Sequence, residues 1–253
     1  MAPPEGLDGS RALVTGASRG IGRALALGLA ASGCDIVGAA RSRPALEELG
    51  AEIEALGRRF LPLELDLAQA ETLANHADIA WRGLGGLEVL VNAAGLIVRT
   101  DTLDVTPEDW DRVFSVNVRG TFFLTREVGR RMLASSHGGS VVTVASLAAE
   151  VATRAAVSYQ ASKAALVQMT RALAVQWAPA VRVNAVGPGY VRTDLNKAWL
   201  EEEENASYVL SRTPMARVGE PGDVVGAVIF LASPASAYVT GEHLLVDGGW
   251  SAQ

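Results

Sequence analysis

The sequence has very little cysteine or histidine: Cys34 is the only cysteine among 253 residues, and there are three histidines. One cysteine excludes an intramolecular disulfide and a cysteine-rich metal site. Its apolar neighbours predict a buried, unreactive thiol. His76, His137 and His243 fall outside the predicted strand ends, and no carboxylate cluster has the spacing of metal ligands. The sequence therefore predicts neither a metal site nor histidine-based catalysis.

Positive charge and long apolar runs are also scarce. The 22 lysines and arginines face 28 aspartates and glutamates, which gives a formal net charge of −6. Nucleic acids and anionic membranes bind basic surfaces, so neither is an expected partner. No apolar run is long enough to cross a bilayer, and the segment 1–8 has no hydrophobic stretch typical of a signal peptide. Together with the lone cysteine, this predicts a reducing, cytoplasmic setting.

What the chain does contain is a regular alternation of strands and helices. Hydrophobic residues make up 49% of it, enough for a substantial core. No linker, repeat or low-complexity tract divides it, so we expect a single domain over residues 1–253. Strands are predicted at 11–15, 35–40, 60–65, 87–91, 139–145, 180–186 and 243–246, and helices at 23–32, 44–57, 70–84, 107–135, 158–177 and 221–233. This order predicts an α/β fold, a parallel sheet with helices on both faces.

A glycine-rich turn follows the first predicted strand. It reads Gly16-Ala17-Ser18-Arg19-Gly20-Ile21-Gly22 and leads directly into a helix. Glycines permit a tight turn and a close backbone approach, and the free N–H groups of a helix N-terminus attract a phosphate. A turn of this kind can merely join two elements. Because a strand precedes it and a helix follows, it predicts a dinucleotide site, with Gly16, Ser18, Arg19, Gly20 and Ile21 as contacts.

The end of the second strand indicates which dinucleotide binds. An acidic residue there would bind the ribose hydroxyls of NAD(H), whereas an arginine accommodates the 2′-phosphate of NADP(H). The sequence has Ala40-Arg41-Ser42-Arg43 and no acid at this point, and Arg19 could approach the same phosphate. NADP(H) is therefore favoured, with NAD(H) possible; the alternative is that these arginines are solvated loop charges. After the third strand, Asp66-Leu67 is expected to contact the adenine.

A tyrosine and a lysine, Tyr159 and Lys163, lie four residues apart near the start of a predicted helix that Ser158 would cap. This spacing places both side chains on one helical face. An ammonium beside a phenol stabilises the phenolate and lowers its pKa, so the pair is a candidate general acid/base. Such pairs also occur by chance on helices. Two further residues support chemistry: Asn117, in mid-helix, where a kink could free a carbonyl for a water, and Ser146, at the carboxyl end of a central strand.

Small residues follow two other strands. They are Asn92-Ala93-Ala94-Gly95 and Gly187-Pro188-Gly189-Tyr190, and each run would let the backbone pass close to a ligand. A plain turn would explain the first run equally well. The segment from 191 to 213 is irregular and polar and includes the acidic run 201–204. It is expected to form a mobile lid, over about 190–215, with the acidic run on its solvated face.

Taken together, these motifs resemble those of the short-chain dehydrogenase/reductase superfamily over nearly the whole chain. The matching stretches are Thr15 to Gly22, Asp66-Leu67, Asn92 to Gly95, Asn117, Ser146, Tyr159-x-x-x-Lys163 and Pro188-Gly189-Tyr190-Val191-x-Thr193. The resemblance implies a Rossmann-like, doubly wound, seven-stranded parallel sheet. It also implies a homotetramer in which the helices at 107–135 and 158–177 pack against their copies, with the tail 246–250 at a subunit contact.

The resemblance also implies a reaction and a role for each motif. Tyr159 would exchange a proton with the substrate oxygen, Ser146 would hydrogen-bond that oxygen, and Lys163 would bind the ribose hydroxyls. Asn117 would hold a water that links Lys163 to solvent. The cofactor contacts would be Gly16, Ser18, Arg19, Gly20, Ile21, Arg41, Asp66, Leu67, Asn92, Ala93, Gly95, Tyr159, Lys163, Pro188, Gly189, Val191 and Thr193. The sequence departs from the family at Ala93, where asparagine is usual, so another group must supply any bond that the amide makes.

At a finer level, four stretches resemble sugar-acid dehydrogenases of the 2-deoxy-gluconate 3-dehydrogenase and gluconate 5-dehydrogenase kind: 26–30, 33–38, 55–60 and 94–97. The expected substrate is a small ketone or alcohol, with 3-oxoacyl-carrier-protein reductases as a rival family. A non-catalytic NADP(H)-binding sensor is the alternative of another class. Residues 96–97, 147–154 and the lid are expected to select the substrate. Arg99, Arg154 or Arg217 could pair with a substrate carboxylate, or each could be a surface charge.

Overall fold

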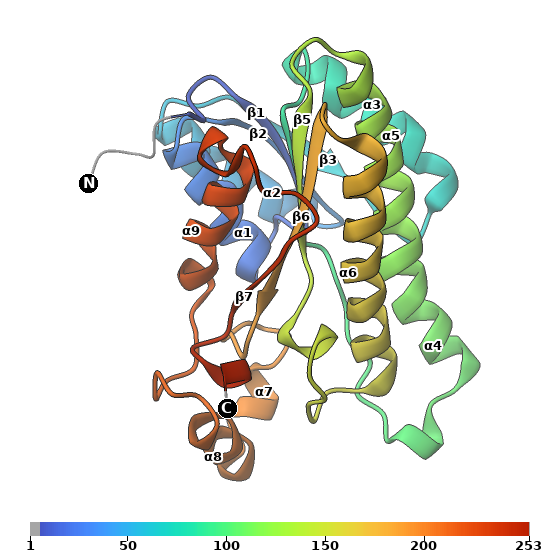
Figure 1. Cartoon of the computed structure of the whole chain (residues 1–253), viewed down its shortest axis with the longest axis vertical. Helices are drawn as coiled ribbons and strands as arrows, with labels where there is room; N and C mark the ends of the chain where they lie inside the picture. Colours follow the sequence, from blue (N-terminus) through green and yellow to red (C-terminus); the bar gives the residue numbers. More distant parts are fainter. Residues whose placement is uncertain (1–5, 253) are drawn as a thin grey trace.

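The computed structural model describes residues 6–252, so the expectation about the segment 1–8 falls largely outside them. Seven parallel strands form one sheet, as expected, and their order is β3-β2-β1-β4-β5-β6-β7 (Figure 1). The strands are β1 Arg11–Thr15, β2 Asp35–Ala40, β3 Phe60–Glu64, β4 Val89–Asn92, β5 Gly139–Val144, β6 Val181–Pro188 and β7 His243–Val246. The order reverses between β1 and β4, which is where open α/β sheets bind their ligands.

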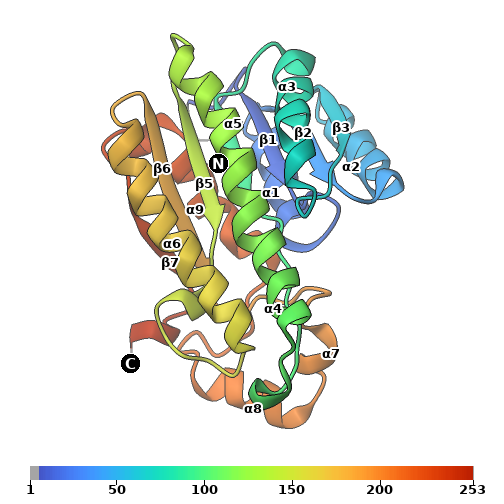
Figure 2. The ribbon, with the colours of Figure 1, turned by 90° about the vertical axis from the view of Figure 1, so that its right-hand side faces the viewer.

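Helices cover both faces of the sheet. One layer holds α1 Gly20–Ala31, α2 Arg43–Ala55 and α9 Pro221–Ala232, and the other holds α3 Leu73–Leu84, α5 Thr121–Ala134 and α6 Val157–Trp177 (Figures 1 and 2). Because side chains alternate along a strand, β1 sends Ala12 and Val14 into one core and Leu13 into the other. Each fully buried leucine contributes about 1.5–3 kcal/mol, so the two cores hold the sheet rigid beneath the strand ends.

The helix predicted over 107–135 is divided into three parts. It consists of α4 Pro107–Phe114, a π-helical segment Ser115–Gly120, and α5. Thr106 caps α4 by accepting a bond from the Asp109 N–H at 3.1 Å. Gly120 explains part of the irregularity, because a Cβ there would lie 2.1 Å from the Leu67 carbonyl oxygen. The wide turn thus lets the helix pass directly against the chain that follows β3, with Asn117 inside it.

Two other expectations are wrong in detail. Helix α6 begins at Val157, with Ala156 as its N-cap and no side-chain cap bond, so Ser158 is a buried first-turn residue rather than the cap. The lid is not irregular throughout, since it contains α7 Lys197–Leu200 and α8 Glu203–Ser211. The acidic run begins this second helix, where negative charge favours the helix dipole.

Apolar packing holds the lid helices in place. Leu200 and Val209 are buried against Trp250 from the C-terminal segment. Around them the rings of Tyr190, Trp199, Tyr208 and Trp250 stack or meet edge to face, with centroids 5.0 to 6.5 Å apart. Such contacts add to the stability that area burial gives. The sequence alone did not show this, because three separate segments contribute the rings.

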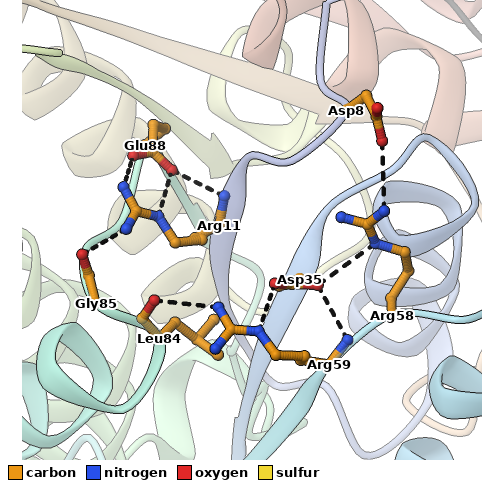
Figure 3. A network of polar contacts seen from close by, with 8 residues as sticks. All are labelled: Asp8, Arg11, Asp35, Arg58, Arg59, Leu84, Gly85 and Glu88. Atoms are coloured by element: carbon orange, nitrogen blue, oxygen red, sulfur yellow. Dashed lines mark hydrogen bonds and ion pairs between the residues drawn. The ribbon is translucent and has the colours of Figure 1, made fainter.

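A network of ion pairs lies at the amino ends of the strands, away from the strand ends that carry the small-residue turns (Figure 3). Arg11 of β1 binds Glu88, which precedes β4, through both its backbone N–H and its guanidinium. Asp35, the first residue of β2, accepts bonds from the Arg59 backbone and side chain at 3.0 and 2.7 Å. Each pair joins neighbouring strands, so the network fixes the register at this edge.

The electrostatic state of the network depends on pH. Burial of the Asp35 carboxyl would raise its pKa, but the bonds from Arg59 and the charges of Arg59 and Arg58 outweigh it, so the pKa is lowered. The Cys34 thiol beside it is fully buried, as expected, and burial raises its pKa to about 12. The thiol is therefore protonated and unreactive near neutral pH.

We predict that Asp35 stabilises the fold in a pH-dependent way. In the unfolded chain the Asp35 carboxylate has a pKa of about 3.9 and takes up its proton at a higher pH than it does in the folded protein. The stability that Asp35 contributes is therefore present above about pH 3.9 and is lost as the pH falls through the folded pKa. Asp35→Asn should cost about 1–3 kcal/mol at pH 7 and less at about pH 3. Urea unfolding at both pH values measures this. Glu54→Gln, at an exposed position of α2, is the control, and an equal loss at both pH values contradicts the role.

Candidate functional site

Two adjoining cavities open at the carboxyl ends of the central strands. The glycine-turn groove lies along the turn after β1 and the ends of β2 and β3, and the tyrosine cavity lies beside it over β5 and β6. The tyrosine cavity has a volume of about 160 Å³. Both are lined by Ile21, Ala93, Gly95, Thr193 and Leu195, so a single elongated ligand can occupy the two together.

The turn after β1 is shaped by close backbone approaches. Gly16 has φ +68°, and a Cβ there would lie 2.8 Å from the Ala94 Cα; one on Gly22 would lie 2.2 Å from the Gly16 carbonyl oxygen. Helix α1 has Arg19 as its N-cap, without a side-chain cap bond and without an acid in its first turn. Its first N–H groups thus face the groove, where they favour an anion such as a phosphate.

All five predicted residues of the turn line the groove, namely Gly16, Ser18, Arg19, Gly20 and Ile21. Arg41, Asp66 and Leu67 line its other end, as the sequence predicts. The two arginines after β2 differ: Arg41 lies at the groove, whereas Arg43 pairs with Glu47 at 2.8 Å on the outside of α2. Asp66 also accepts a bond from the Ala68 N–H at 3.0 Å, which orients its carboxyl group. A cation and an acceptor are therefore placed for a nucleotide with a phosphate at one end.

The run after β4 joins the groove to the tyrosine cavity. Ala93 and Gly95 line both cavities, but the Asn92 side chain points into the protein, where its amide donates to Thr125 and Thr143 at 2.8 and 3.3 Å. The Asn92 side chain therefore lines neither cavity, although the residue is expected to contact the cofactor. The Thr15 hydroxyl accepts from the N–H groups of both Ala93 and Ala94 at 3.1 Å. This hydroxyl and the Asn92 amide brace the sheet beside Ala93, at the position where the family usually has an asparagine.

Tyr159 and Ser146 meet in the tyrosine cavity. Ser146 follows β5, and its hydroxyl accepts from the Ala148 N–H at 3.1 Å and hydrogen-bonds the Tyr159 phenol. The expected lowering of the tyrosine pKa by Lys163 is not found for the protein alone. Burial raises the pKa of Tyr159, and the Ser146 bond and the charge of Arg99 offset only part of this. The charge of Arg99, from the loop after β4, thus favours the phenolate, and the Lys163 ammonium lies 5.6 Å from the centre of the Tyr159 ring.

Lys163 and Asn117 lie behind the tyrosine. The Lys163 ammonium is 4% exposed, donates to the Val144 carbonyl at 2.8 Å, and has its pKa lowered to about 8 by burial. The Asn117 side chain, from the π-helical segment, accepts from the Leu96 N–H and donates to the Leu96 carbonyl and to Ser162 at 2.9 to 3.0 Å. A Cβ on Gly95 would lie 3.5 Å from both polar groups. The four predicted catalytic residues are therefore brought together.

Every charged side chain that lines the tyrosine cavity is cationic: Arg99, Arg154 and Lys163. Arg99 lies over the Trp199 ring at 5.5 Å, and burial lowers its pKa. Arg154 pairs with Glu204 of α8 at 2.9 Å and covers the Tyr208 ring at 4.2 Å. Arg217 is not in this cavity, because it is paired twice with Asp223, at 2.6 and 2.8 Å. Arg154 and Arg217 are each paired with a carboxylate, whereas Arg99 has no such ion pair among residues 6–252.

The loop after β6 closes the site. Pro188, Gly189 and Val191 line the tyrosine cavity, and Thr193 lines both cavities, as predicted. The sequence did not single out Asp194, Leu195, Asn196 or Trp199, which also line the site. Three of them, Asp194, Leu195 and Asn196, directly follow Thr193 in the sequence, and this adjacency is the signal that could have indicated them. Elsewhere in residues 6–252, three or more His, Cys, Asp or Glu side chains nowhere gather as a metal site would require, and every helix is too short or too polar to cross a membrane.

Comparison with known proteins identifies close relatives over the full length. A family model described as enoyl-(acyl carrier protein) reductase matches residues 16–251. The 2-dehydro-3-deoxy-D-gluconate 5-dehydrogenase of Escherichia coli (strain K12) is 39% identical over 98% of this chain and 97% of its own. The galactitol 2-dehydrogenase (L-tagatose-forming) of Cereibacter sphaeroides is 40% identical over 97% of this chain and 96% of its own.

A solved structure is similar over the same length. The gluconate 5-dehydrogenase of Burkholderia cenocepacia J2315, in complex with NADP and tartrate, has a TM-score of 0.93 and 34% identity, over 97% of this chain and 96% of that one. The seven-stranded parallel sheet, the glycine turn and the Tyr-x-x-x-Lys helix agree with these matches. The chain therefore belongs to the short-chain dehydrogenase/reductase superfamily of oxidoreductases with an NAD(P)-binding Rossmann fold.

Proposed function

We propose that the chain is an NADP(H)-dependent dehydrogenase that interconverts a secondary alcohol and a ketone on a small sugar acid. The observation that carries this proposal is the charge of the tyrosine cavity: Arg99, Arg154 and Lys163 line it, and no aspartate or glutamate does. A cavity with only cationic groups attracts an anionic substrate. Its polar side chains, Ser146, Tyr159 and Asn196, suit a substrate that also carries hydroxyl groups.

The proton chemistry follows from the two hydroxyl groups that meet in the cavity. The bound nicotinamide accepts or gives the hydride. In oxidation, the substrate O–H bond breaks and its proton passes to the Tyr159 phenolate while the carbinol C–H pair leaves as hydride; reduction reverses both steps. Ser146 hydrogen-bonds the same oxygen and fixes its direction. Because burial and its neighbours leave the Tyr159 pKa raised, a second positive charge from the oxidised nicotinamide ring is needed to form the phenolate near neutral pH.

The remaining predicted residues hold the reactants. Lys163 would bind the nicotinamide ribose hydroxyls, and Asn117 would hold the water that connects Lys163 to solvent. Val191 and Thr193 would contact the carboxamide, next to Pro188 and Gly189 at the end of β6. What supports these roles is position: Thr193 lines both cavities, and Lys163 and the Asn117 side chain both lie beside Gly95, which also lines both.

The two cavity arginines would have different tasks. Arg154 is already paired with Glu204 and packs on Tyr208, so it ties the loop after β5 to the lid. Arg99 stacks on Trp199, and its charge interacts with the Tyr159 phenol. No carboxylate in the cavity pairs with it. A planar guanidinium binds a carboxylate with two parallel bonds. Arg99 would therefore hold the substrate acid group while its charge favours the phenolate.

The relatives support a substrate of this class. The Escherichia coli and Burkholderia relatives are named for a sugar acid, 2-dehydro-3-deoxy-D-gluconate or gluconate, and the Cereibacter relative is named for the polyol galactitol. The Burkholderia structure was determined with NADP and tartrate, a hydroxy acid with two carboxylates. A 3-oxoacyl-thioester reductase is the second candidate, favoured by the acyl-carrier-protein description of the family model. A non-catalytic NADP(H) sensor is the third, and the presence of all four predicted catalytic residues speaks against it.

A single domain, a homotetramer and a cytoplasmic setting complete the proposal. Apolar side chains are exposed on two helices expected at subunit contacts: Val157 and Val175 on α6, and Leu133 on α5. Exposed apolar groups in one layer are typical of surfaces that pack against another chain.

The first expected outcome concerns Tyr159. Tyr159→Phe should lower kcat by about 10²–10⁴-fold, because the substrate proton loses its acceptor, and it should leave the Kd for NADPH unchanged. Turnover with gluconate, 2-dehydro-3-deoxy-D-gluconate, galactitol, a cyclic ketone and a 3-oxoacyl thioester, each with both cofactors, identifies the substrate class. Tyr238→Phe, at a fully exposed position, is the control. Near-normal kcat in Tyr159→Phe contradicts the assignment, and a thioester as the best substrate favours the second candidate.

The second concerns Arg99. Arg99→Gln should raise KM for acidic substrates by about ten- to hundredfold, as expected for losing a bidentate charged hydrogen bond. The KM of a neutral polyol should change little. Arg154→Gln should have a smaller effect on KM, and Arg217→Gln, outside the cavity, none. The assignment fails if Arg99→Gln affects acids and polyols equally.

The third concerns cofactor choice. The wild type should have a higher kcat/KM with NADP⁺ than with NAD⁺, because Arg41 lies at the groove and no acid follows β2. Arg41→Asp should reverse the preference, and Arg43→Asp, which faces away from the groove, should not. A wild type that prefers NAD⁺ refutes this part of the proposal.

A further inference from the structure

The segment 191–196, here called the strap, crosses from the tyrosine cavity to the glycine-turn groove. It is braced internally: the Asn196 side chain accepts from the Thr193 N–H at 3.0 Å and donates to the Val191 carbonyl at 2.9 Å. The Arg192 N–H also donates to the Gly219 carbonyl at 2.8 Å. The strap is therefore a defined turn, and its side chains have fixed directions.

One face of the strap lies on the glycine turn. A Cβ on Gly20 would meet the Thr193 methyl at 3.3 Å, and the Asp194 carboxylate pairs with the Arg19 guanidinium at 3.6 Å. Arg19 and Asp194 both line the groove, and their side chains are 67% and 62% exposed at its rim. Asp194 of the strap is thus paired with Arg19, one of the two arginines expected to bind the 2′-phosphate.

The charges that line the groove make this pair unusual. They are Arg19 and Arg41 on the basic side and Asp66 and Asp194 on the acidic side. Asp66 lies after β3, where its carboxyl accepts the Ala68 N–H. Of the two acids, Asp194 is the one that pairs with an arginine of the groove. Its carboxylate reduces the positive charge that Arg19 offers to a phosphate, and it also repels the phosphate directly.

We infer that Asp194 is a specificity-determining residue for the cofactor: its carboxylate competes with the 2′-phosphate for Arg19 and reduces the preference for NADP(H) over NAD(H). The inference rests on the proposed 2′-phosphate site at Arg41 and Arg19. The diphosphate is common to both cofactors and would lie against the backbone N–H groups of the turn, so repulsion from Asp194 on that part would cancel in the ratio of the two affinities. The two cofactors differ only in the 2′-phosphate, which the exposed Arg19 side chain at the rim of the groove would contact.

The test measures binding rather than turnover. The Kd values of NADPH and NADH are determined by energy transfer from the tryptophans to the reduced nicotinamide, for wild type, Asp194→Asn, Arg19→Gln and the double variant. Asp194→Asn should tighten NADPH by about two- to fivefold, the range of an exposed ion pair, and leave NADH within error. The gain should shrink between about 0.05 and 0.5 M salt.

The double variant separates the ion pair from a general charge effect. In the Arg19→Gln background, Asp194→Asn should have a clearly smaller effect on the NADPH Kd, because the competition for Arg19 is gone. Asp104→Asn changes the net charge equally at an exposed position in the loop before α4, and should leave both Kd values unchanged.

Several results overturn the inference: weaker NADPH binding in Asp194→Asn, an equal change for NADH and NADPH, or a full effect that persists without Arg19. A wild type that binds NADH more tightly than NADPH refutes the proposed cofactor preference instead. In that case the shift of the NADPH-to-NADH ratio in Asp194→Asn still decides the role of Asp194.

Discussion

The close approach of the glycine turn to the run after β4 is the constraint on which the site depends. Gly16 packs its Cα against the Ala94 backbone, and the Thr15 hydroxyl accepts from two consecutive N–H groups of that run. This contact joins the two halves of the sheet at the point where the strand order reverses. It places Ala93 and Gly95 in both cavities, so the groove along the turn adjoins the cavity that holds Tyr159.

Burial shifts the pKa values of Tyr159 and Lys163. Lys163 lies at 4% exposure against the carbonyl of Val144, and its pKa is lowered to about 8; the pKa of Tyr159 is raised for the same reason. In a low-dielectric site, a charge that arrives with a ligand acts more strongly than it would in water. A cationic cofactor ring and an anionic substrate would therefore each change the proton affinity of the groups around them.

The lid segment packs against the loops after β4 and β5 and against the C-terminal segment. Trp199 supports Arg99 and stacks on Tyr190, Tyr208 supports Arg154, and the rings of Tyr190 and Tyr208 pack with Trp250 from the C-terminal segment. The cationic groups of the tyrosine cavity are thus held by aromatic contacts instead of by acidic partners alone. Such contacts stabilise an arginine while leaving its hydrogen-bond donors available for a ligand.

Local sequence determined much of this protein. The alternation of apolar runs and the glycine turn predicted the parallel sheet, and the Tyr159 to Lys163 spacing predicted two side chains on one helical face, because these features depend on neighbours a few residues apart. The resemblance to a superfamily added the roles of Asn117 and Ser146. The sequence indicated a kink at Asn117, but not its π-helical form, and the capping of α6 and the lid helices were not predicted. Each of these depends on residues distant in sequence, such as Leu67 against Gly120.

Charge placement was decided only by the tertiary structure. The sequence offered Arg99, Arg154 and Arg217 as equal candidates, and folding put the first beside Tyr159, tied the second to Glu204 and paired the third with Asp223. It likewise made Asp194 a neighbour of Arg19 across 175 positions of the chain (194 minus 19). Sequence patterns report which face of an element is apolar, whereas an ion pair between loops depends on how those elements pack, so only the folded chain shows it.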